Sequence, residues 1–230
     1  MQVLSGFSEL AAAWDNVYTS NMSEKDNAVN ITSEKNRYHH GDLRSALVEE
    51  GLKLIDMGPV DALSLREIAR RAGVSATAVY RHFPDKAALL GALCLEGHAR
   101  MAKAFEAAMA SASPGVEAFN AMGRAYVNFA LAHPSLFRLM MAQTGGPAPV
   151  PAPIAGGGGS DGMQILVNAI EGLFGPDAPV HLHEAGRLRA WSLVHGLAML
   201  MLDGQVPSEP ALIEAVVDAS VLQGTEPVRR

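Results

Sequence analysis

Apolar residues recur every three or four positions over several stretches of the chain, the spacing of helices with one buried face. The first clear stretch follows Gly41 and stops at Gly58-Pro59. A long one opens at Asp85 and reaches about Ala110. Further helices are predicted at about 115–132, 135–142, 163–174, 181–203 and 208–222. No convincing strand pattern is found, so the sequence predicts an all-α fold.

Between the first and the long helix, residues 64–83 read SLREIARRAGVSATAVYRHF. Ser64 and Glu67 have the spacing of a capping box, in which each side chain accepts from the other residue's backbone N–H. Gly73 can take the positive φ of a tight turn, and Ser75 can cap a second short helix. Two short helices around a small turn residue form a helix-turn-helix, whose second helix enters the DNA major groove.

Two segments show no such periodicity. Residues 1–36 are rich in Asn, Ser, Glu and Lys, which predicts a flexible arm with at most a short helix near Phe7–Val17. Met22 is an alternative start of the chain, and we expect residues 1–21 to be dispensable for folding. Residues 143–162 are rich in Gly, Pro and Ala and are predicted to form a mobile loop.

The net charge of −6 is unevenly distributed. Residues 37–103 carry ten Lys/Arg against eight Asp/Glu, and the segments on either side are acidic. This asymmetry favours a nucleic-acid partner for the middle segment. The single cysteine, Cys94, excludes a disulfide framework and a Cys-rich zinc module. Neither a secretory signal nor an apolar run of roughly 18 residues is present, so a cytoplasmic protein without a membrane span is expected.

The second helix of the helix-turn-helix would present Thr77 and Arg81 to the groove, where Arg81 suits a guanine edge as well as a phosphate. Residues near its end could reach the sugar-phosphate backbone. The predicted DNA-binding residues are Ser64, Ser75, Thr77, Ala78, Tyr80, Arg81, His82 and Lys86.

This part of the chain, about residues 38–98, resembles the TetR family of bacterial repressors. The matching run is Leu65, Ile68-Ala69, Ala72-Gly73-Val74-Ser75, Ala78, Tyr80, His82-Phe83, Lys86 and Leu89-Leu90. The Tyr-x-His-Phe ending followed by Lys is far more specific than a generic helix-turn-helix. The resemblance implies that Tyr80, His82 and Lys86 contact phosphates.

The C-terminal half resembles a TetR subclass with a Trp-x-x-x-His-Gly signature, here Trp191 to Gly196, and a central His-Pro segment, here His133–Met140. Trp191 and His195 lie one turn apart on one helix face, and Gly196 would permit close approach of another helix. The resemblance implies a DNA-binding domain over 37–84 and an effector-binding and dimerisation domain over 85–230.

Several apolar residues of that domain form either ordinary core or an apolar effector pocket between helices. The candidates are Met122, Phe129, Phe137, Met140, Met141, Trp191 and His195. His195 is better explained as a hydrogen-bonded histidine of the core or of a dimer interface than as a ligand of a metal or effector. No residue pattern indicates a catalytic site, a cofactor or a metal, so the sequence predicts neither an enzyme nor a metal sensor.

The sequence therefore predicts a homodimeric repressor that a small apolar or amphipathic effector releases from a palindromic double-stranded DNA operator. An activator, or a DNA-binding protein without an effector, is the alternative. The helices at 181–203 and 208–222 would form the dimer interface, unless their apolar stripes are buried within one chain. The stripes are Leu193, Leu197, Leu200 and Met201 on one helix and Leu212, Ala215, Val216 and Ala219 on the other.

Overall fold

The structure is a computed structural model that describes residues 43–143 and 161–218. These residues form nine α-helices and one 3-10 turn without a strand, which confirms the predicted all-α fold. No helix within them is long and apolar enough to cross a membrane. The predicted arm at 1–36 and nearly all of the predicted loop at 143–162 lie outside the described residues.

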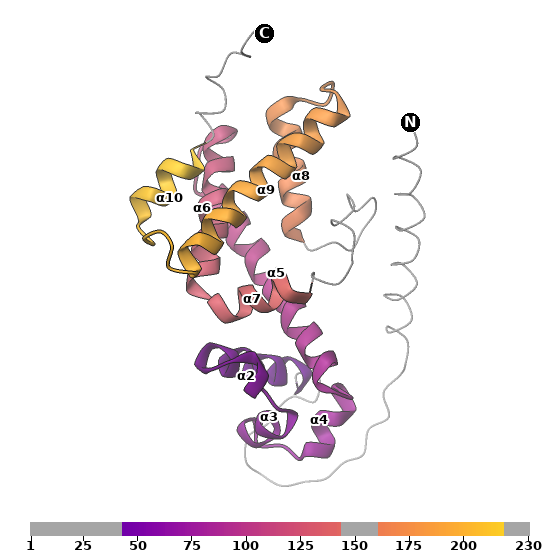
Figure 1. The fold of residues 1–230 in the computed structure, drawn as a ribbon. Helices are drawn as coiled ribbons and strands as arrows, with labels where there is room; N and C mark the ends of the chain where they lie inside the picture. Colours follow the sequence, from indigo (N-terminus) through magenta and orange to yellow (C-terminus); the bar gives the residue numbers. More distant parts are fainter. Residues whose placement is uncertain (1–42, 144–160, 219–230) are drawn as a thin grey trace, which may run out of the picture.

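Three helices form the lower end of the molecule (Figure 1). They are α2 (Leu43–Met57), α3 (Leu65–Ala72) and α4 (Ala76–His82), and the 3-10 turn η1 (Val60–Ala62) joins α2 to α3. The α3–α4 pair is the predicted helix-turn-helix, and its two helices begin and end where the sequence signals place them.

Side-chain caps and one glycine set the bounds of the α3–α4 pair. The Ser64 side chain accepts a hydrogen bond from the Glu67 backbone N–H at 3.2 Å, and Ser75 caps α4 in the same way. Gly73 ends α3 with a φ of 68°, as predicted. The capping box is only half formed, because the Glu67 carboxylate binds Arg70 instead of reaching back to Ser64.

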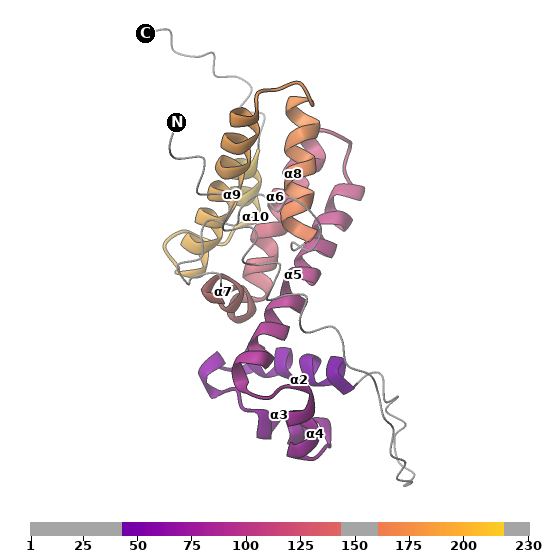
Figure 2. The same cartoon turned by 90° about the vertical axis from the view of Figure 1, so that its right-hand side faces the viewer.

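The long helix α5 (Lys86–Ala110) rises from this end into the upper part of the molecule, as both views show (Figures 1 and 2). Asp85 caps it by accepting from the Ala88 N–H at 2.8 Å. The upper helices are α6 (Val116–Ala132), α7 (Pro134–Gln143), α8 (Asp161–Phe174), α9 (Val180–Leu202) and α10 (Pro210–Val217).

Three helices of the upper part, α7, α8 and α10, differ from the prediction at their ends. The helix expected over 208–222 is shorter, because α10 stops before Asp218, whose backbone is extended and whose carboxylate accepts from Asn120 at 3.3 Å. The described segments on either side of the predicted loop are helical up to Gln143 and from Asp161.

One apolar core runs through both ends of the molecule because α5 contributes to each. Leu93 of α5 rests on Gly51 of α2, where an added Cβ would lie 2.9 Å from its Cδ2. Farther along α5, Met101 and Phe105 pack against Gly162 at the start of α8. A second, smaller cluster joins α6, α9 and α10 through Val127, Leu197, Met201, Ile213 and Val217.

A glycine allows α6 to approach α10 in this smaller cluster. A Cβ on Gly123 would lie 2.6 Å from Cγ1 of Val217 and 3.4 Å from Cγ1 of Val194. The sequence predicted that another helix could approach closely at Gly196. No atom of the described chain lies within 4 Å of its Cβ position, so no helix of its own chain makes that approach. Gly196 instead lies on the side of α9 that its own chain leaves uncovered.

We expect Gly123→Ala to destabilise the protein by about 1–3 kcal/mol, because the new methyl must displace the stiff, branched Val217. Gly91→Ala is the matched control. Gly91 also lies within a helix, its Cβ position is open, and this change should stabilise by about 0.5–1 kcal/mol. Urea unfolding at one protein concentration measures both. Equal stability of the two variants would contradict the close α6–α10 contact.

Candidate functional site

α4 turns one apolar residue inward and its polar residues outward. Val79 is fully buried, whereas Thr77, Arg81 and His82 are exposed and Tyr80 is 48% exposed in spite of its aromatic ring. Ala78 is half-buried. The residues predicted to bind DNA therefore share one exposed face beside the turn.

Ser64 and Ser75, also predicted to bind DNA, are exposed and act as the caps of α3 and α4. Each hydroxyl accepts a backbone N–H and keeps its own proton. Both can therefore donate to a phosphate without giving up the cap. These roles combine local structure with the chemistry that a DNA backbone requires.

Lys86, the first residue of α5, is tied to the turn that precedes α3. Its Nζ donates to the Asp61 carbonyl at 2.8 Å. An ammonium group has three protons, so two remain for a phosphate. Lys86 thus fixes the start of α5 to η1.

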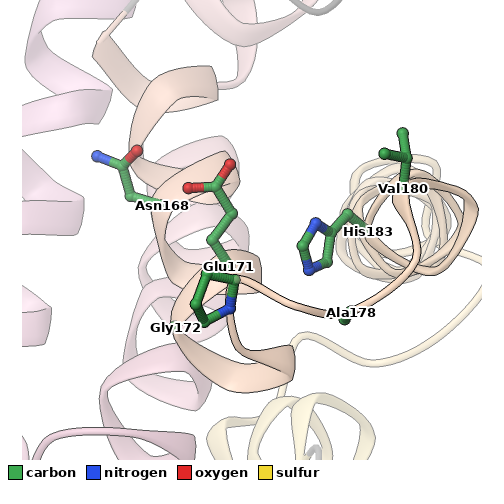
Figure 3. Close-up of a pocket in the computed structure, with 7 residues that line it drawn as sticks. Asn168, Glu171, Gly172, Ala178, Val180 and His183 are labelled. Atoms are coloured by element: carbon green, nitrogen blue, oxygen red, sulfur yellow. The ribbon is translucent and has the colours of Figure 1, made fainter.

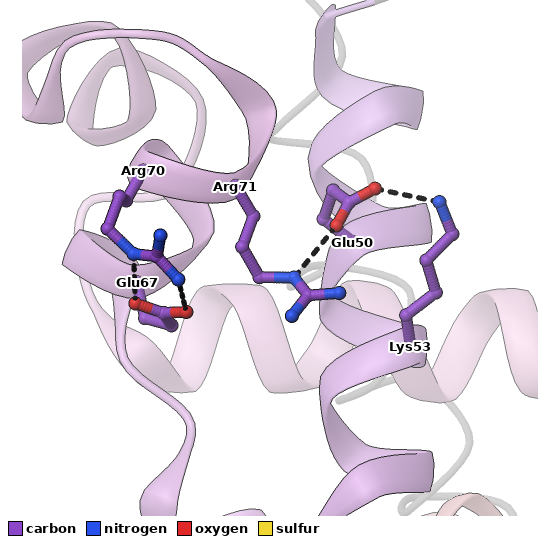
Figure 4. Close-up of polar contacts among 5 residues, drawn as sticks. All are labelled: Glu50, Lys53, Glu67, Arg70 and Arg71. Atoms are coloured by element: carbon purple, nitrogen blue, oxygen red, sulfur yellow. Dashed lines mark hydrogen bonds and ion pairs between the residues drawn. The ribbon is translucent and has the colours of Figure 1, made fainter.

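Carboxylates hold two arginines of α3 (Figure 4). Glu67 accepts from Arg70 at 2.6 and 2.8 Å, and this bond lowers the pKa of Glu67. Glu50 of α2 accepts from Lys53 at 2.7 Å and from Arg71 at 3.1 Å, and these bonds, Lys53 first, lower its pKa. The Arg71–Glu50 pair fixes α3 against α2.

A further ion pair joins α5 to α2. Arg100 binds Glu49 of α2 and, at 2.9 Å, Glu96 of its own helix. Near it, the Cys94 thiol faces the Leu139 carbonyl of α7. Burial raises the pKa of Cys94 to about 11, so this thiol is protonated and poorly reactive at neutral pH.

In the upper part, a group of rings surrounds Tyr126 of α6. The Tyr126 hydroxyl lies 3.0 Å from Nδ1 of His195, and its ring centroid lies 6.2 Å from that of Phe105 and 5.6 Å from that of Phe137. Trp191 and His195 have centroids 6.4 Å apart, which confirms that they share a helix face. We call these five residues the Tyr126 cluster.

Burial keeps the polar groups of this cluster uncharged. It raises the pKa of Tyr126 to about 12, against a smaller effect of a hydrogen bond from Trp191, and it lowers the pKa of His195. The Tyr126 hydroxyl and a neutral His195 therefore share their hydrogen bond without a charge on either group. His195 thus has the hydrogen-bond partner expected of a satisfied core or dimer-interface histidine.

The sequence missed Tyr126, although Met122, Tyr126 and Phe129 follow helical spacing. Most of the predicted pocket residues lie in the same core as the cluster: Met122, Phe129, Phe137 and Met140 are buried, and Met141 and Trp191 pack against them. The structure therefore brings these residues together as a packed core.

Two open cavities lie elsewhere. One of about 530 Å³ lies where α8 turns into α9, with Glu171, Ala178, Val180 and His183 in its lining (Figure 3). The other, of about 400 Å³, lies between α5 and α8. None of the predicted pocket residues lines either one.

Two histidines, His181 and His183, lie near the start of α9. His183 is hydrogen-bonded to the Gly175 carbonyl at 3.1 Å, and His181 is exposed. Within residues 43–143 and 161–218, no three His, Cys, Asp or Glu side chains are grouped closely enough to hold a metal ion.

The capped helix pair with its exposed α4, set below a helical domain by one long helix, is the arrangement of a DNA-binding transcriptional regulator. Two family models match: "Bacterial regulatory proteins, tetR family" over residues 47–93, and "Tetracyclin repressor-like, C-terminal domain" over 119–223. The chain belongs to the TetR family, as its helix-turn-helix residues indicated. Neither description names the Trp-His-Gly subclass, which stays a prediction.

Solved structures agree with this assignment. A protein of unknown function from Rhodococcus sp. RHA1 is 34% identical, with a TM-score of 0.65 over 82% of this chain and 96% of that one. A TetR family regulator from Marinobacter aquaeolei VT8 is 24% identical, with a TM-score of 0.56 over 79% and 95%. One from Streptomyces coelicolor is 22% identical, with a TM-score of 0.55 over 80% and 81%. No curated protein matches the chain.

Burial also lowers the pKa of His98, whose buried Nδ1 has no partner among the described residues. Unfolded histidines take up a proton near pH 6.5, whereas His98 and His195 resist it when folded. Their contribution to stability is therefore complete above pH 6.5 and is lost as the pH falls through the folded values.

We expect the melting temperature to fall between about pH 7.5 and about pH 5.5, and to fall less for His98→Leu. His181→Leu, which replaces an exposed histidine, should keep the full decrease. Differential scanning calorimetry across this range measures all three proteins. An identical pH dependence for wild type and His98→Leu would show that His98 is not protonated on unfolding.

Proposed function

We propose that the protein is a homodimeric repressor that binds a palindromic operator and is released from it by a small effector in the C-terminal domain. The proposal rests on the exposed polar residues of α4 and on Lys86. All of them lie within the segment that matches the tetR model. Thr77 and Arg81 would reach base edges, and Ala78 suits a thymine methyl. Tyr80, His82 and Lys86, with Ser64 and Ser75, would bind the backbone.

The surface of α9 supports a dimer. Leu193 and Leu200 are 37% and 42% exposed, and Gly196 lies between them on the same face with open space above it. Leu197 and Met201 instead lie in the smaller cluster of their own chain, with Leu212 and Val216 packed against it. Of the predicted stripe residues, those in the smaller cluster pack within their own chain, and Leu193 and Leu200 lie on an uncovered α9 face that a second copy would bury. Ala219 lies outside the described residues.

α5 supplies the link between effector and operator. Its start carries Lys86, and Arg100 ties it to Glu49 of α2. An effector that favours a tilted α5 would shift both α4 helices of the dimer away from the half-site spacing of about 34 Å. Operator affinity would then fall by at most the factor by which the effector binds the tilted state more tightly than the DNA-binding state.

Lys86→Ala should weaken binding to every DNA sequence and reduce the slope of log affinity against log salt by about one unit, because one phosphate contact is lost. Lys103→Ala, an exposed lysine farther along α5, should leave the slope unchanged. Operator titrations over a salt series measure both. An unchanged slope with an altered base preference would make Lys86 a base-reading residue.

Leu193→Glu combined with Leu200→Glu should give folded monomers that bind a half-site weakly, because two charges would enter the α9 interface. Analytical ultracentrifugation measures the mass, and circular dichroism checks the fold. Leu95→Glu, on an exposed leucine of α5, should remain a dimer. If the double variant stays dimeric with full operator affinity, the interface lies elsewhere.

A further inference from the structure

We propose that two copies of the chain pair antiparallel through α9, with Gly196 at the two-fold axis and Arg189 of each copy bound to the partner's Asp203. This inference rests on the proposed function, because it gives the register of the proposed homodimer. It also names the charges that select a second copy of this chain as the partner. Three features of α9 support it: one long uncovered face, the place of Gly196 on that face, and the spacing of its charges.

The uncovered face of α9 extends along most of the helix. Since a helix turns by about 100° per residue, residues three, four and seven positions apart share a face. Apart from Gly196, every residue on this face is exposed, and a Cβ on Gly196 would meet no atom within 4 Å. The residues of the face are Leu182, Ala185, Arg189, Ser192, Leu193, Gly196, Leu200 and Asp203, which caps the end of α9.

Gly196 determines where a second helix crosses this face. Because glycine has no side chain, its backbone allows the closest approach of any residue on the face. A two-fold dimer brings the same patch of both copies together, so the point of closest approach lies at the axis. In an antiparallel pair, each residue before Gly196 then lies opposite the partner residue equally far after it. Leu193 and Leu200, three positions before and four after, pack across the axis.

The charges on the face match in this register. Arg189 lies seven positions before Gly196 and Asp203 lies seven after, which is about 10 Å along the helix on either side. Antiparallel pairing therefore places Arg189 beside the partner's Asp203, twice in each dimer. In a parallel pairing, Arg189 would meet the partner's Arg189 and repel it. A partner chain without this pair of opposite charges would leave both unpaired, which disfavours it.

Both side chains are available for this contact. Arg100, Arg124 and Arg138 are bound to carboxylates, whereas exposed Arg189 forms no ion pair within the described residues. Asp203 accepts from Arg138 of α7 at 2.6 Å, and Arg138 also donates to the Leu202 carbonyl at 3.2 Å. An ionised carboxylate has about four acceptor sites, so Asp203 can bind a second guanidinium. Arg138 thus holds this carboxylate at the end of α9.

Charge reversal tests the pairing. Arg189→Asp and Asp203→Arg should each weaken the dimer by at least about tenfold, because two attractions in each dimer become repulsions. A mixture of the two variants should associate at least about tenfold more tightly than either variant alone, because each copy then meets opposite charges. Arg187→Asp is the matched control: Arg187 lies on the opposite side of α9, so the dimer Kd should stay unchanged. Analytical ultracentrifugation over a concentration series measures every Kd.

Gly196→Leu gives a measurement that does not depend on charge. Within its own chain the new side chain has open space, so circular dichroism should show an intact fold. Between two copies the same side chain would separate the helices, so the dimer should weaken by at least about tenfold. An unchanged dimer Kd in Gly196→Leu would show that the axis lies elsewhere and would overturn the inference.

A wild-type Kd in Arg189→Asp would overturn the register, as would a mixture that associates no better than its components. Equal weakening by Arg187→Asp and Arg189→Asp would overturn it too, because position on the helix would then not matter. In each of these cases the wild-type protein is still a dimer, so the proposed function stands. A wild-type protein that stays monomeric at every concentration would overturn the proposed homodimer and its register together.

Discussion

The structure depends on α5, because this one helix supplies buried side chains to both ends of the molecule. Leu89 and Leu93 complete the core beneath the helix-turn-helix, and Met101 and Phe105 complete the core of the upper domain. A packed core resists deformation, so the side chains of α5 hold each end firmly to this helix. At about 1.5 Å per residue, its 25 residues span about 38 Å, and a small rotation at one end becomes a displacement of several ångströms at the other.

The sequence predicted the fold well where the signal is local. Ser64, Ser75 and Asp85 each cap the helix that follows, and Gly73 takes the left-handed conformation expected of it. Such signals depend on a few neighbouring residues and survive in any tertiary setting. At Gly196 the sequence predicted that another helix can approach closely, but helical spacing does not show which side of a helix faces its own chain, and the described chain leaves that Cβ position open.

The candidate site was predicted less completely for the same reason. The spacing of apolar residues predicted that Phe137, Met140 and Trp191 lie in one group. It did not identify Tyr126 as the residue at the centre of that group, because apolar spacing shows which residues share a face and not which of them forms the hydrogen bond. Glu67 and Arg70 are three residues apart, so their pair was open to prediction from helical spacing. The pair of Glu50 and Arg71 joins residues 21 positions apart and needs the packing of α2 on α3.

The carboxylate pairing on α3 has a consequence for attraction to DNA of arbitrary sequence. This attraction depends on cations free to displace the counterions of the phosphates. Arg70 is bound to Glu67, Arg71 shares Glu50 with Lys53, and the whole chain has a net charge of −6. These two arginines therefore add less to non-specific attraction than unpaired arginines would, which leaves a larger share of the discrimination to contacts with the bases.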